Sequence, residues 1–249
     1  MSMRDKHLAA KQLPQKVVIV IPAYNAGAQI ASVVDSIPKI VTVHDASFAT
    51  EVVVVEDGSK DDTFNEALKT RATVLRHVMN SGAGAATRTG LKYAETLGDS
   101  VAYVITIDAD GQHNADDIDR LLGCAIDTKA DVVIGNRLHS GNRAAMPVHR
   151  VLGNKGLTLI SRMLFGIKVE DTQSGLRLYS ADKLRIISTY TIDRYGFCTE
   201  SLWLASRAKL HIQEVPIEVS YSDETLSHGQ NNWGVVDLLL DLLWIRMVG

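Results

Sequence analysis

Asp108 and Asp110 lie two residues apart at the end of an apolar run, and Gln112 follows two residues later. Two carboxylates just beyond a strand can turn toward one hard divalent cation, to which Gln112 adds a third oxygen. This spacing predicts a metal site at Asp108, Asp110 and Gln112. A calcium-binding helical loop needs glycine at its sixth position, whereas Gly111 is fourth from Asp108, so that motif is excluded. The remaining alternative is that both acids cap a helix beginning near Asn114.

The apolar run before Asp108 is one of several that alternate with helix-like segments. This alternation predicts a mostly parallel sheet with helices on both faces. The predicted strands are Val17–Ile21, Val52–Val55, Thr73–His77, Val101–Ile107 and Asp131–Ile134. The second and fourth are almost continuous in apolar residues, as expected for central strands that are buried on both faces. A polar stretch rich in arginine and glycine then leads to a helix-like run that ends at Phe165.

The segments that follow the predicted strands are the candidate binding residues, because in open α/β sheets the ligand lies beyond the carboxyl ends of the strands. These segments are Pro22–Asn25, Glu56–Ser59, Asn80–Gly84, Asp108–Asp110 and Gly135–Arg137. Taken singly, the first two are also explained as a turn and a helix cap. Their shared position at strand ends favours a common binding site.

The Gly82-x-Gly84 pair invites comparison with a dinucleotide-binding fingerprint, since a strand ending in Asp108 follows at about the expected distance. That fingerprint needs Gly or Ala where Thr87 stands, and it needs a more apolar preceding strand than Thr73–Asn80. We therefore do not expect a nicotinamide or flavin site.

Bulk properties limit the remaining choices. The chain has 249 residues, 46% of them hydrophobic, which suits one α/β domain with a sizeable core. A formal charge of -3 provides no basic field for nucleic acid. Cys124 and Cys198 are too few for a disulfide framework, so we expect a cytoplasmic protein. Met1–Lys16 lacks the apolar core of a signal peptide, and no run is long enough to span a bilayer, so any membrane contact is expected to be peripheral.

The joint order of the strand-end segments resembles glycosyltransferase family 2, whose members have the GT-A fold. The resemblance extends from about Val17 to about Leu243 and is closest to the branch of dolichyl-phosphate mannose synthase and polyprenyl-phosphate glycosyltransferases. Later matching segments include Asp171–Gly175 and Glu214–Ile217. The resemblance implies one domain over residues 1–249, in which residues 17–137 bind the nucleotide sugar, residues 138–233 form the acceptor side and residues 234–249 form an apolar helix.

The same resemblance assigns roles to individual residues. Asp57 accepts a hydrogen bond from the nucleobase, and Glu56 stands where the family more often has Asp. The metal at Asp108, Asp110 and Gln112 is Mg2+ or Mn2+ and bridges the donor diphosphate. The residues expected to line the donor are Pro22, Tyr24, Asn25, Asp57, Asn80, Gly82, Arg88, Asp108 and Arg150. The residues expected to act in catalysis are Asp110, Arg137, Asp171 and Glu200.

The implied reaction is transfer of a sugar, with inversion, from a nucleotide-sugar donor to a polyprenyl or dolichyl phosphate. Such an acceptor is already ionised at neutral pH and needs no base, and Arg137 and Arg150 would guide the phosphates together. A saccharide acceptor would instead require Asp171 or Glu200 as a general base. The absence of Lys and Arg in residues 224–232 keeps that alternative open. A third alternative is a non-catalytic subunit that binds nucleotide sugars.

The C-terminal segment Gly234–Gly249 is almost entirely apolar apart from Asp237 and Asp241, which share one face of a predicted helix. The segment is too short and too acidic to span a bilayer. It is predicted either to pack on the sheet domain or in a homo-oligomer interface, or to lie on a membrane surface near the lipid acceptor.

Overall fold

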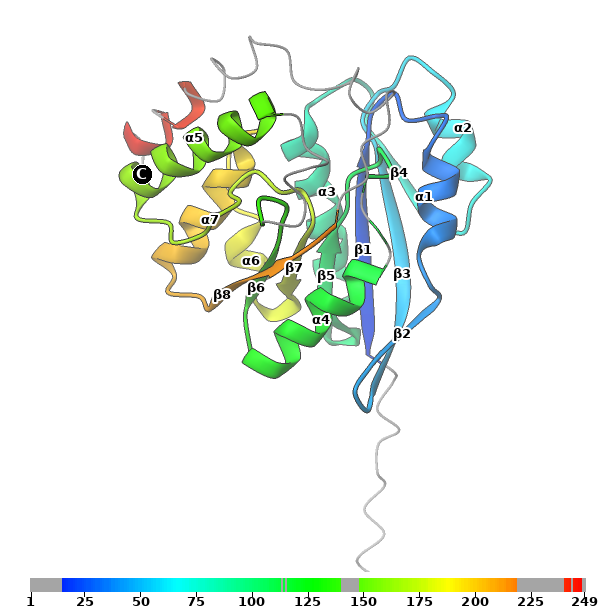
Figure 1. Ribbon diagram of the computed structural model, residues 1–249. Helices are drawn as coiled ribbons and strands as arrows, with labels where there is room; N and C mark the ends of the chain where they lie inside the picture. Colours follow the sequence, from blue (N-terminus) through cyan, green and yellow to red (C-terminus); the bar gives the residue numbers. More distant parts are fainter. Residues whose placement is uncertain are drawn as a thin grey trace, which may run out of the picture.

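The computed structural model describes residues 15–112, 114, 116–139, 148–218, 240–242 and 244–247, and no side chain of residues 148–150. Within these residues one sheet of eight strands forms the centre of the molecule (Figure 1). The strands are β1 (Lys16–Ala23), β2 (Ile40–Val43), β3 (Ala46–Glu56), β4 (Thr73–Arg76), β5 (Val101–Thr106), β6 (Val132–Asn136), β7 (Arg177–Ser180) and β8 (Ile212–Pro216).

Helices alternate with these strands along the chain. They are α1 (Ile30–Ser36), α2 (Thr63–Leu68), α3 (Ala83–Thr96), α4 (Asp116–Thr128), α5 (Val148–Phe165), α6 (Leu184–Ile187) and α7 (Phe197–Arg207), with short 3-10 turns at Gly98–Ser100 and Ala181–Lys183. Residues 240–242 and 244–247 are also helical, and we call them the C-terminal helical segment.

The sheet is mixed. β1 lies between β3 and β5 and is parallel to both, β4 adds to β3 in parallel, and β8 is parallel to β6. β7 is inserted antiparallel between β5 and β6, and β2 is antiparallel to the first half of β3. The predicted α/β sheet flanked by helices is therefore confirmed. The antiparallel β7 is what joins the two parallel groups of strands into one sheet.

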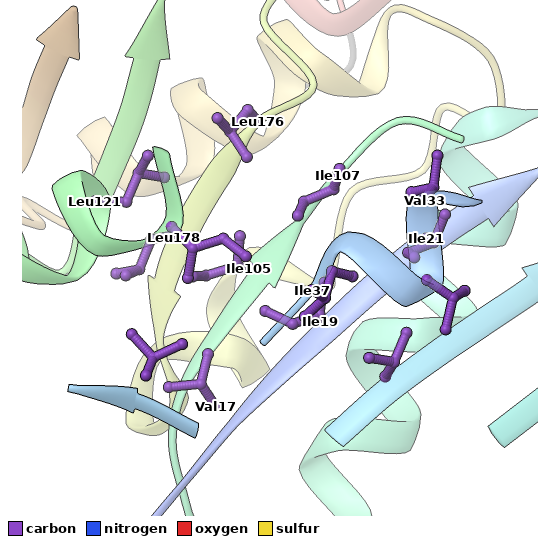
Figure 2. Close-up of a cluster of buried hydrophobic side chains, with 14 of the residues drawn as sticks. Val17, Ile19, Ile21, Val33, Ile37, Ile105, Ile107, Leu121, Leu176 and Leu178 are labelled. Atoms are coloured by element: carbon purple, nitrogen blue, oxygen red, sulfur yellow. The ribbon is translucent and has the colours of Figure 1, made fainter. Parts of the chain in front are cut away.

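Alternate residues of the central strands enter two separate cores, as the period of a strand requires. Ile19 and Ile21 of β1 face a core with α1 and α4, and Figure 2 shows Ile19 beside Ile37 and Ile21 beside Val33. The opposite face, including Val20, packs on α3, α6 and α7. The near-continuous apolar runs of β1 and β3 follow from burial on both faces.

All five predicted strands are present, with ends that differ by up to six residues, the largest difference being at the start of β3. β2, β7 and β8 are additional strands that the sequence pattern did not reveal. They are only four or five residues long, and β7 and β8 include polar residues such as Arg177 and Glu214, so their alternation is weak. β2 forms a tight hairpin with β3 in which His44 adopts a positive φ of 51°.

The C-terminal helical segment packs against α5. Leu242 and Ile245 are buried and contact a cluster that includes Ile160 and Leu164 of α5 and Trp203 of α7. The predicted packing on the domain is therefore observed for this part of residues 234–249, whereas residues 234–239, 243, 248 and 249 lie outside the described residues. Among the described helices, none is both long and apolar enough to cross a membrane.

Candidate active site

The loops that follow β1 and β3 are hydrogen-bonded to each other at the carboxyl edge of the sheet. Asn25, which has a left-handed φ of 51°, donates its backbone N–H to Ser59 Oγ at 3.0 Å, and its Oδ1 accepts the N–H of Lys60 at 2.9 Å. Asparagine tolerates this backbone conformation better than most residues. The predicted donor residues Pro22, Tyr24 and Asn25 therefore belong to one fixed double loop, on which Tyr24 is exposed.

Asp57 is buried and anchors the next loop. Its Oδ1 accepts the N–H of Ser81 at 2.9 Å and contacts His77 Nδ1 at 2.7 Å, while its Oδ2 accepts the N–H of Gly82 at 2.8 Å. The other ring nitrogen of His77 lies 2.9 Å from Thr89 Oγ1 on α3. The carboxylate thus connects the end of β3 to the glycine-containing turn before α3, a connection that sequence reasoning missed.

The turn that contains Gly82 and Gly84 packs closely against residues 192–193. A Cβ at Gly82 would lie 2.3 Å from the carbonyl oxygen of Asp193, and one at Gly84 would lie 2.5 Å from that of Ile192. Gly82 also has a φ of 101°, which disfavours any side chain. Gly82 and Gly84 therefore make room for residues 192–193.

Arg88 on α3 binds the same neighbouring segment. Its guanidinium donates to the carbonyl oxygen of Tyr190 at 3.1 Å and pairs with the carboxylate of Asp193. Asn80, in the loop before α3, is exposed. Asn80 precedes the Gly82 turn in the sequence and Arg88 follows it. Arg150 falls among the residues whose side chains are not described.

Asp108 lies directly against Gly175, a contact that joins β5 to the loop before β7. A Cβ at Gly175 would be 2.3 Å from both carboxylate oxygens of Asp108, and the carbonyl of Gly175 accepts Thr106 Oγ1 at 2.7 Å. Only glycine leaves room for the Asp108 carboxylate in this position. The predicted metal ligand and the predicted acceptor-side loop are therefore in contact.

Asp108 and Asp110 create a negative region at this edge. The pKa of the neighbouring Tyr195 is raised, first by partial burial and then by the charges of Asp108 and Asp110. The N–H of Gln112 donates to Asp110 Oδ1 at 3.0 Å, which holds the loop around Asp110. The described residues contain no group of three or more His, Cys, Asp or Glu side chains arranged around a metal. Two carboxylates with one amide nevertheless fit the oxygen-rich, partly hydrated coordination of Mg2+ or Mn2+.

Arg137 and Asp171 form a bidentate ion pair. Arg137 Nε and Nη2 donate to Asp171 Oδ2 and Oδ1 at 2.8 and 2.9 Å, and the backbone N–H of Arg137 also reaches Oδ2 at 3.1 Å. Burial by itself raises the pKa of the fully buried Asp171, but the Arg137 guanidinium and the N–H of Gln173 hold it below its ordinary value. Two residues proposed for catalysis are therefore coupled to each other.

Glu214 of β8 holds the loop of Asp171 in place through hydrogen bonds to its backbone. The two carboxylate oxygens of Glu214 accept the backbone N–H groups of Glu170 and Asp171 at 2.8 and 3.0 Å. Glu170 in turn accepts Asn136 Nδ2 at 3.0 Å. The sequence marked Glu214 only through its matching segment, and its function as a support for the Asp171 loop depends on a strand pairing that no local pattern reveals.

Arg177 of β7 is a second support that sequence reasoning missed. It is fully buried and donates to the carbonyl oxygens of Thr172, Ser174 and Cys198, each at 2.8 Å, and to Ser201 Oγ at 2.9 Å. A planar guanidinium satisfies several acceptors in fixed directions, which a lysine would not. It joins the loop before Gly175 to the start of α7.

Glu200 in the first turn of α7 is buried, and both of its carboxylate oxygens accept hydrogen bonds. Its Oε2 accepts the N–H groups of Thr191 and Ile192, both at 2.9 Å, and its Oε1 accepts Thr191 Oγ1 at 3.1 Å. This carboxylate fixes the segment of residues 191–192 that packs on the Gly82 turn. A role in ordering the loop is what these contacts favour.

A shallow cavity of about 740 Å³ lies elsewhere, between α4, the β2–β3 turn and the end of β8. It includes His44, Asp119, Cys124 and Val215, and none of the predicted site residues lines it. Most of the predicted residues instead stand at or just after the carboxyl ends of β1, β3, β5 and β6; this edge of β1 and β3 is uppermost in Figure 1.

The fold of solved glycosyltransferases matches this arrangement. Glucosyl-3-phosphoglycerate synthase from Mycobacterium tuberculosis, solved with phosphoglyceric acid, superposes with a TM-score of 0.68 at 22% identity, covering 94% of this chain and 81% of that one. The same enzyme solved with Mn2+, uridine diphosphate and glucosyl-3-phosphoglycerate gives a TM-score of 0.65 at 20% identity and the same coverage. The mixed sheet flanked by helices is therefore that of the GT-A glycosyltransferases.

The sequence comparisons define the family. Residues 18–185 match the model of glycosyl transferase family 2. A UDP-N-acetylglucosamine–dolichyl-phosphate N-acetylglucosaminyltransferase from Methanococcus voltae is 33% identical over 93% of this chain and 96% of its own length. A polyprenol monophosphomannose synthase from Mycolicibacterium smegmatis is 32% identical over 82% of this chain and 77% of its own. The chain belongs to glycosyl transferase family 2 and is a glycosyltransferase, and its resemblance to the dolichyl-phosphate and polyprenyl-phosphate branch is confirmed.

Proposed function

We propose that this glycosyltransferase moves a sugar from a nucleotide-sugar donor to a polyprenyl or dolichyl phosphate, with inversion at the anomeric carbon and with Mg2+ or Mn2+ as cofactor. The relatives from Methanococcus voltae and Mycolicibacterium smegmatis are named for acceptors of this kind. The observation that carries the proposal concerns Asp171 and Glu200, the two carboxylates considered as general bases. Both already accept hydrogen bonds from other residues of the chain.

Asp171 is poorly suited to remove a proton from an acceptor hydroxyl. Its pKa is held below the ordinary value, and its oxygens accept four N–H donors from Arg137 and Gln173. A general base works best with a pKa near the working pH. Glu200 is similarly occupied by Thr191 and Ile192. An acceptor that is already an anion removes the need for such a base, and a phosphate monoester with a second pKa of about 6 is one.

The Arg137 side chain is 14% exposed, so the cation of the pair reaches the site while its carboxylate partner remains buried. We assign Asp171 the task of orienting Arg137, and Arg137 that of holding the acceptor phosphate beside the donor. A guanidinium fixed by one edge presents its charge with little loss of side-chain entropy. In this proposal the pair contributes to catalysis by positioning and electrostatics, which supply most of the rate enhancement when the nucleophile is already ionised.

Asp108, Asp110 and Gln112 would hold the cation, which when bound neutralises charge on the departing nucleoside diphosphate. Gly175 sets the position of Asp108, and the N–H of Gln112 sets that of Asp110. Through the loop of residues 171–175 these ligands connect to Arg137, so the donor and acceptor halves of the site share one structural unit. The loops after β1 and β3, including Tyr24 and Asp57, would receive the nucleoside.

The test of this proposal is the identity and stereochemistry of the product. Purified protein is incubated with an α-linked nucleotide sugar and a short polyprenyl phosphate, and the product is analysed by NMR. We expect a β-linked sugar on the prenyl phosphate. An α-linked product would overturn inversion, and transfer only to free saccharides would overturn the acceptor assignment.

A further inference from the structure

Three nitrogen donors surround the Asp57 carboxylate at the end of β3. Its Oδ1 lies 2.9 Å from the backbone nitrogen of Ser81 and 2.7 Å from His77 Nδ1, and its Oδ2 lies 2.8 Å from the backbone nitrogen of Gly82. An ionised carboxylate can only accept hydrogen bonds, so His77 Nδ1 carries the proton of its contact. His77 therefore supplies the one side-chain donor of the three, which is the one that a substitution can remove.

The His77 ring is held from both ends. The backbone N–H of His77 donates to the carbonyl oxygen of Glu56 at 2.8 Å, which continues the pairing of β4 with β3. Its Nε2 lies 2.9 Å from Thr89 Oγ1 on α3, and the side chain is 19% exposed. With the backbone fixed on one side and Nε2 on the other, Nδ1 is directed at Asp57.

The turn after Asp57 packs tightly on the loop that follows His77. Gly58 has a φ of 67°, and a Cβ on it would lie 2.4 Å from the carbonyl carbon of Met79. Only glycine permits this approach. The Asp57 side chain is 3% exposed, so the carboxylate has little room to rotate and its two oxygens are not interchangeable.

The hydrogen bonds leave the two oxygens of Asp57 with different capacities. A carboxylate offers about four lone-pair positions, two on each oxygen. Among the described residues, Ser81 and His77 fill both positions of Oδ1, and Gly82 fills one position of Oδ2. One position, on Oδ2, is left to accept a hydrogen bond from a ligand.

A single acceptor position distinguishes between nucleobases. Uracil presents one ring N–H between two carbonyl oxygens, and this N–H needs one acceptor. Guanine presents a ring N–H beside an amino N–H, and a carboxylate binds that pair with both oxygens. With Oδ1 of Asp57 already filled, guanine would leave one N–H unpaired, and a site that leaves a polar group unpaired discriminates against that ligand.

We propose that His77 is a positioning residue that sets the base specificity of the donor site. By filling Oδ1 of Asp57 it leaves Oδ2 alone to bind the base, so uracil is selected over guanine. The inference rests on the proposed function, which brings the nucleoside of the donor to Asp57. His77 acts through Asp57 and needs no contact of its own with the nucleotide.

The experiment is isothermal calorimetry of the full chain with UDP and with GDP, both in the presence of Mn2+, since these ligands differ only in the base. Wild type should bind UDP at least about tenfold more tightly than GDP, which corresponds to about one hydrogen bond. His77→Asn keeps an amide N–H near the position of Nδ1 and should retain this preference. His77→Gln places its amide nearer the position of Nε2, leaves Oδ1 open and should reduce the preference at least about fivefold.

Two further variants complete the set. Thr89→Val keeps the His77 ring but releases its Nε2, and it should reduce the preference in the same direction, which keeps the test decisive if His77→Gln does not fold. His211→Gln, at an exposed position before β8, is the matched control and should leave both dissociation constants unchanged. Thermal unfolding verifies the fold of each variant.

Equal affinity of wild type for UDP and GDP would overturn the proposal, and so would an unchanged preference in every folded variant of His77 and Thr89. A His77→Asn variant that loses as much preference as His77→Gln would overturn the role of the N–H, because ring packing would then explain both. Binding is measured without an acceptor, which separates this inference from the proposed function. Selective binding of UDP with transfer only to saccharides refutes the proposed acceptor alone, whereas transfer to a prenyl phosphate with equal affinity for both nucleotides refutes this inference alone.

Discussion

The guanidinium of Arg137 donates two hydrogen bonds to the carboxylate of Asp171, from Nε to Oδ2 at 2.8 Å and from Nη2 to Oδ1 at 2.9 Å. The carboxylate is wholly buried, and the arginine retains a small exposed fraction. Because the loop of Asp171 continues to Gly175, which contacts Asp108, this pair is the point at which the proposed metal site and the proposed acceptor-phosphate site are joined.

Asp171→Asn should reduce sugar transfer by at least about tenfold while leaving nucleotide affinity near the wild-type value, because Arg137 loses its anchor and the donor loops are untouched. It should also lower the free energy of unfolding by about 3 kcal/mol, since the mostly buried guanidinium of Arg137 loses the charge of Asp171. The control is Asp193→Asn, which breaks the more exposed pair with Arg88 and should cost at most about 1 kcal/mol. Equal losses in both variants would contradict the account.

The stability effect of Asp171 should depend on pH. Its folded-state pKa lies below the ordinary value of 3.8, so its contribution is complete above that pH and is lost as the pH falls through the lower folded value. Chemical denaturation of wild type and Asp171→Asn between pH 3 and pH 7 measures this. The difference between the two should be constant from about pH 5 upward and should shrink only in more acidic solution. A difference that disappears near neutrality would exclude an ionised Asp171.

Asp110→Asn should retain the fold but lose nearly all turnover, because in the proposed function Asp110 is a charged ligand of the cation that would stabilise the leaving diphosphate. Raising the Mn2+ concentration should restore part of the activity if the loss lies in metal affinity. Thermal unfolding and turnover are measured across a Mn2+ titration. Activity close to wild type at low Mn2+ would remove Asp110 from the metal site.

Gly175→Ala should impair the metal site without touching a ligand, because the new Cβ would collide with both oxygens of Asp108. We expect a higher Mn2+ requirement and a lower maximal rate. Gly153→Ala on α5 is the matched control, since a Cβ there meets nothing within 4 Å and alanine favours a helix by about 1 kcal/mol. Indistinguishable Mn2+ titrations for Gly175→Ala and Gly153→Ala would show that the close contact has no functional consequence.

Asp57→Ala should weaken nucleotide binding by about 1 to 3 kcal/mol, since it removes a charged acceptor and leaves the N–H groups of Ser81 and Gly82 without this partner. Isothermal calorimetry with the free nucleoside diphosphate measures the change. Asp35→Ala, at an exposed position of α1, should leave the dissociation constant unchanged. If Asp57→Ala also leaves it unchanged, Asp57 serves only to hold the glycine turn.

The sequence predicted the parallel core and the strand-end loops because these depend on local features, namely apolar runs and the polar residues that follow them. It did not predict β7 or β8, since short strands with polar residues are stabilised by their neighbours in the sheet and not by their own pattern. For the same reason the supports Arg177 and Glu214 were missed. Their partners lie on segments that only the antiparallel insertion of β7 and the pairing of β8 with β6 bring together.

Some predicted site residues have partners that the sequence did not suggest. Arg88 and Glu200 bind the chain's own segment of residues 190–193, and the glycine turn packs on that segment as well. The contacts of Arg88 and of the glycine turn join residues about a hundred positions apart, a separation at which residue type and spacing carry no information. The residue types were chemically suitable for a ligand, but in this structure they also build the walls of the site.

The most direct test of the account is transfer of label from a panel of nucleotide sugars to polyprenyl phosphate, with the unphosphorylated polyprenol as the matched acceptor. The account predicts that one donor yields label in the organic phase with the phosphate and not with the alcohol, and that EDTA abolishes the transfer until Mg2+ or Mn2+ is restored. Equal transfer to the phosphate and the alcohol, or transfer that EDTA does not affect, would contradict it.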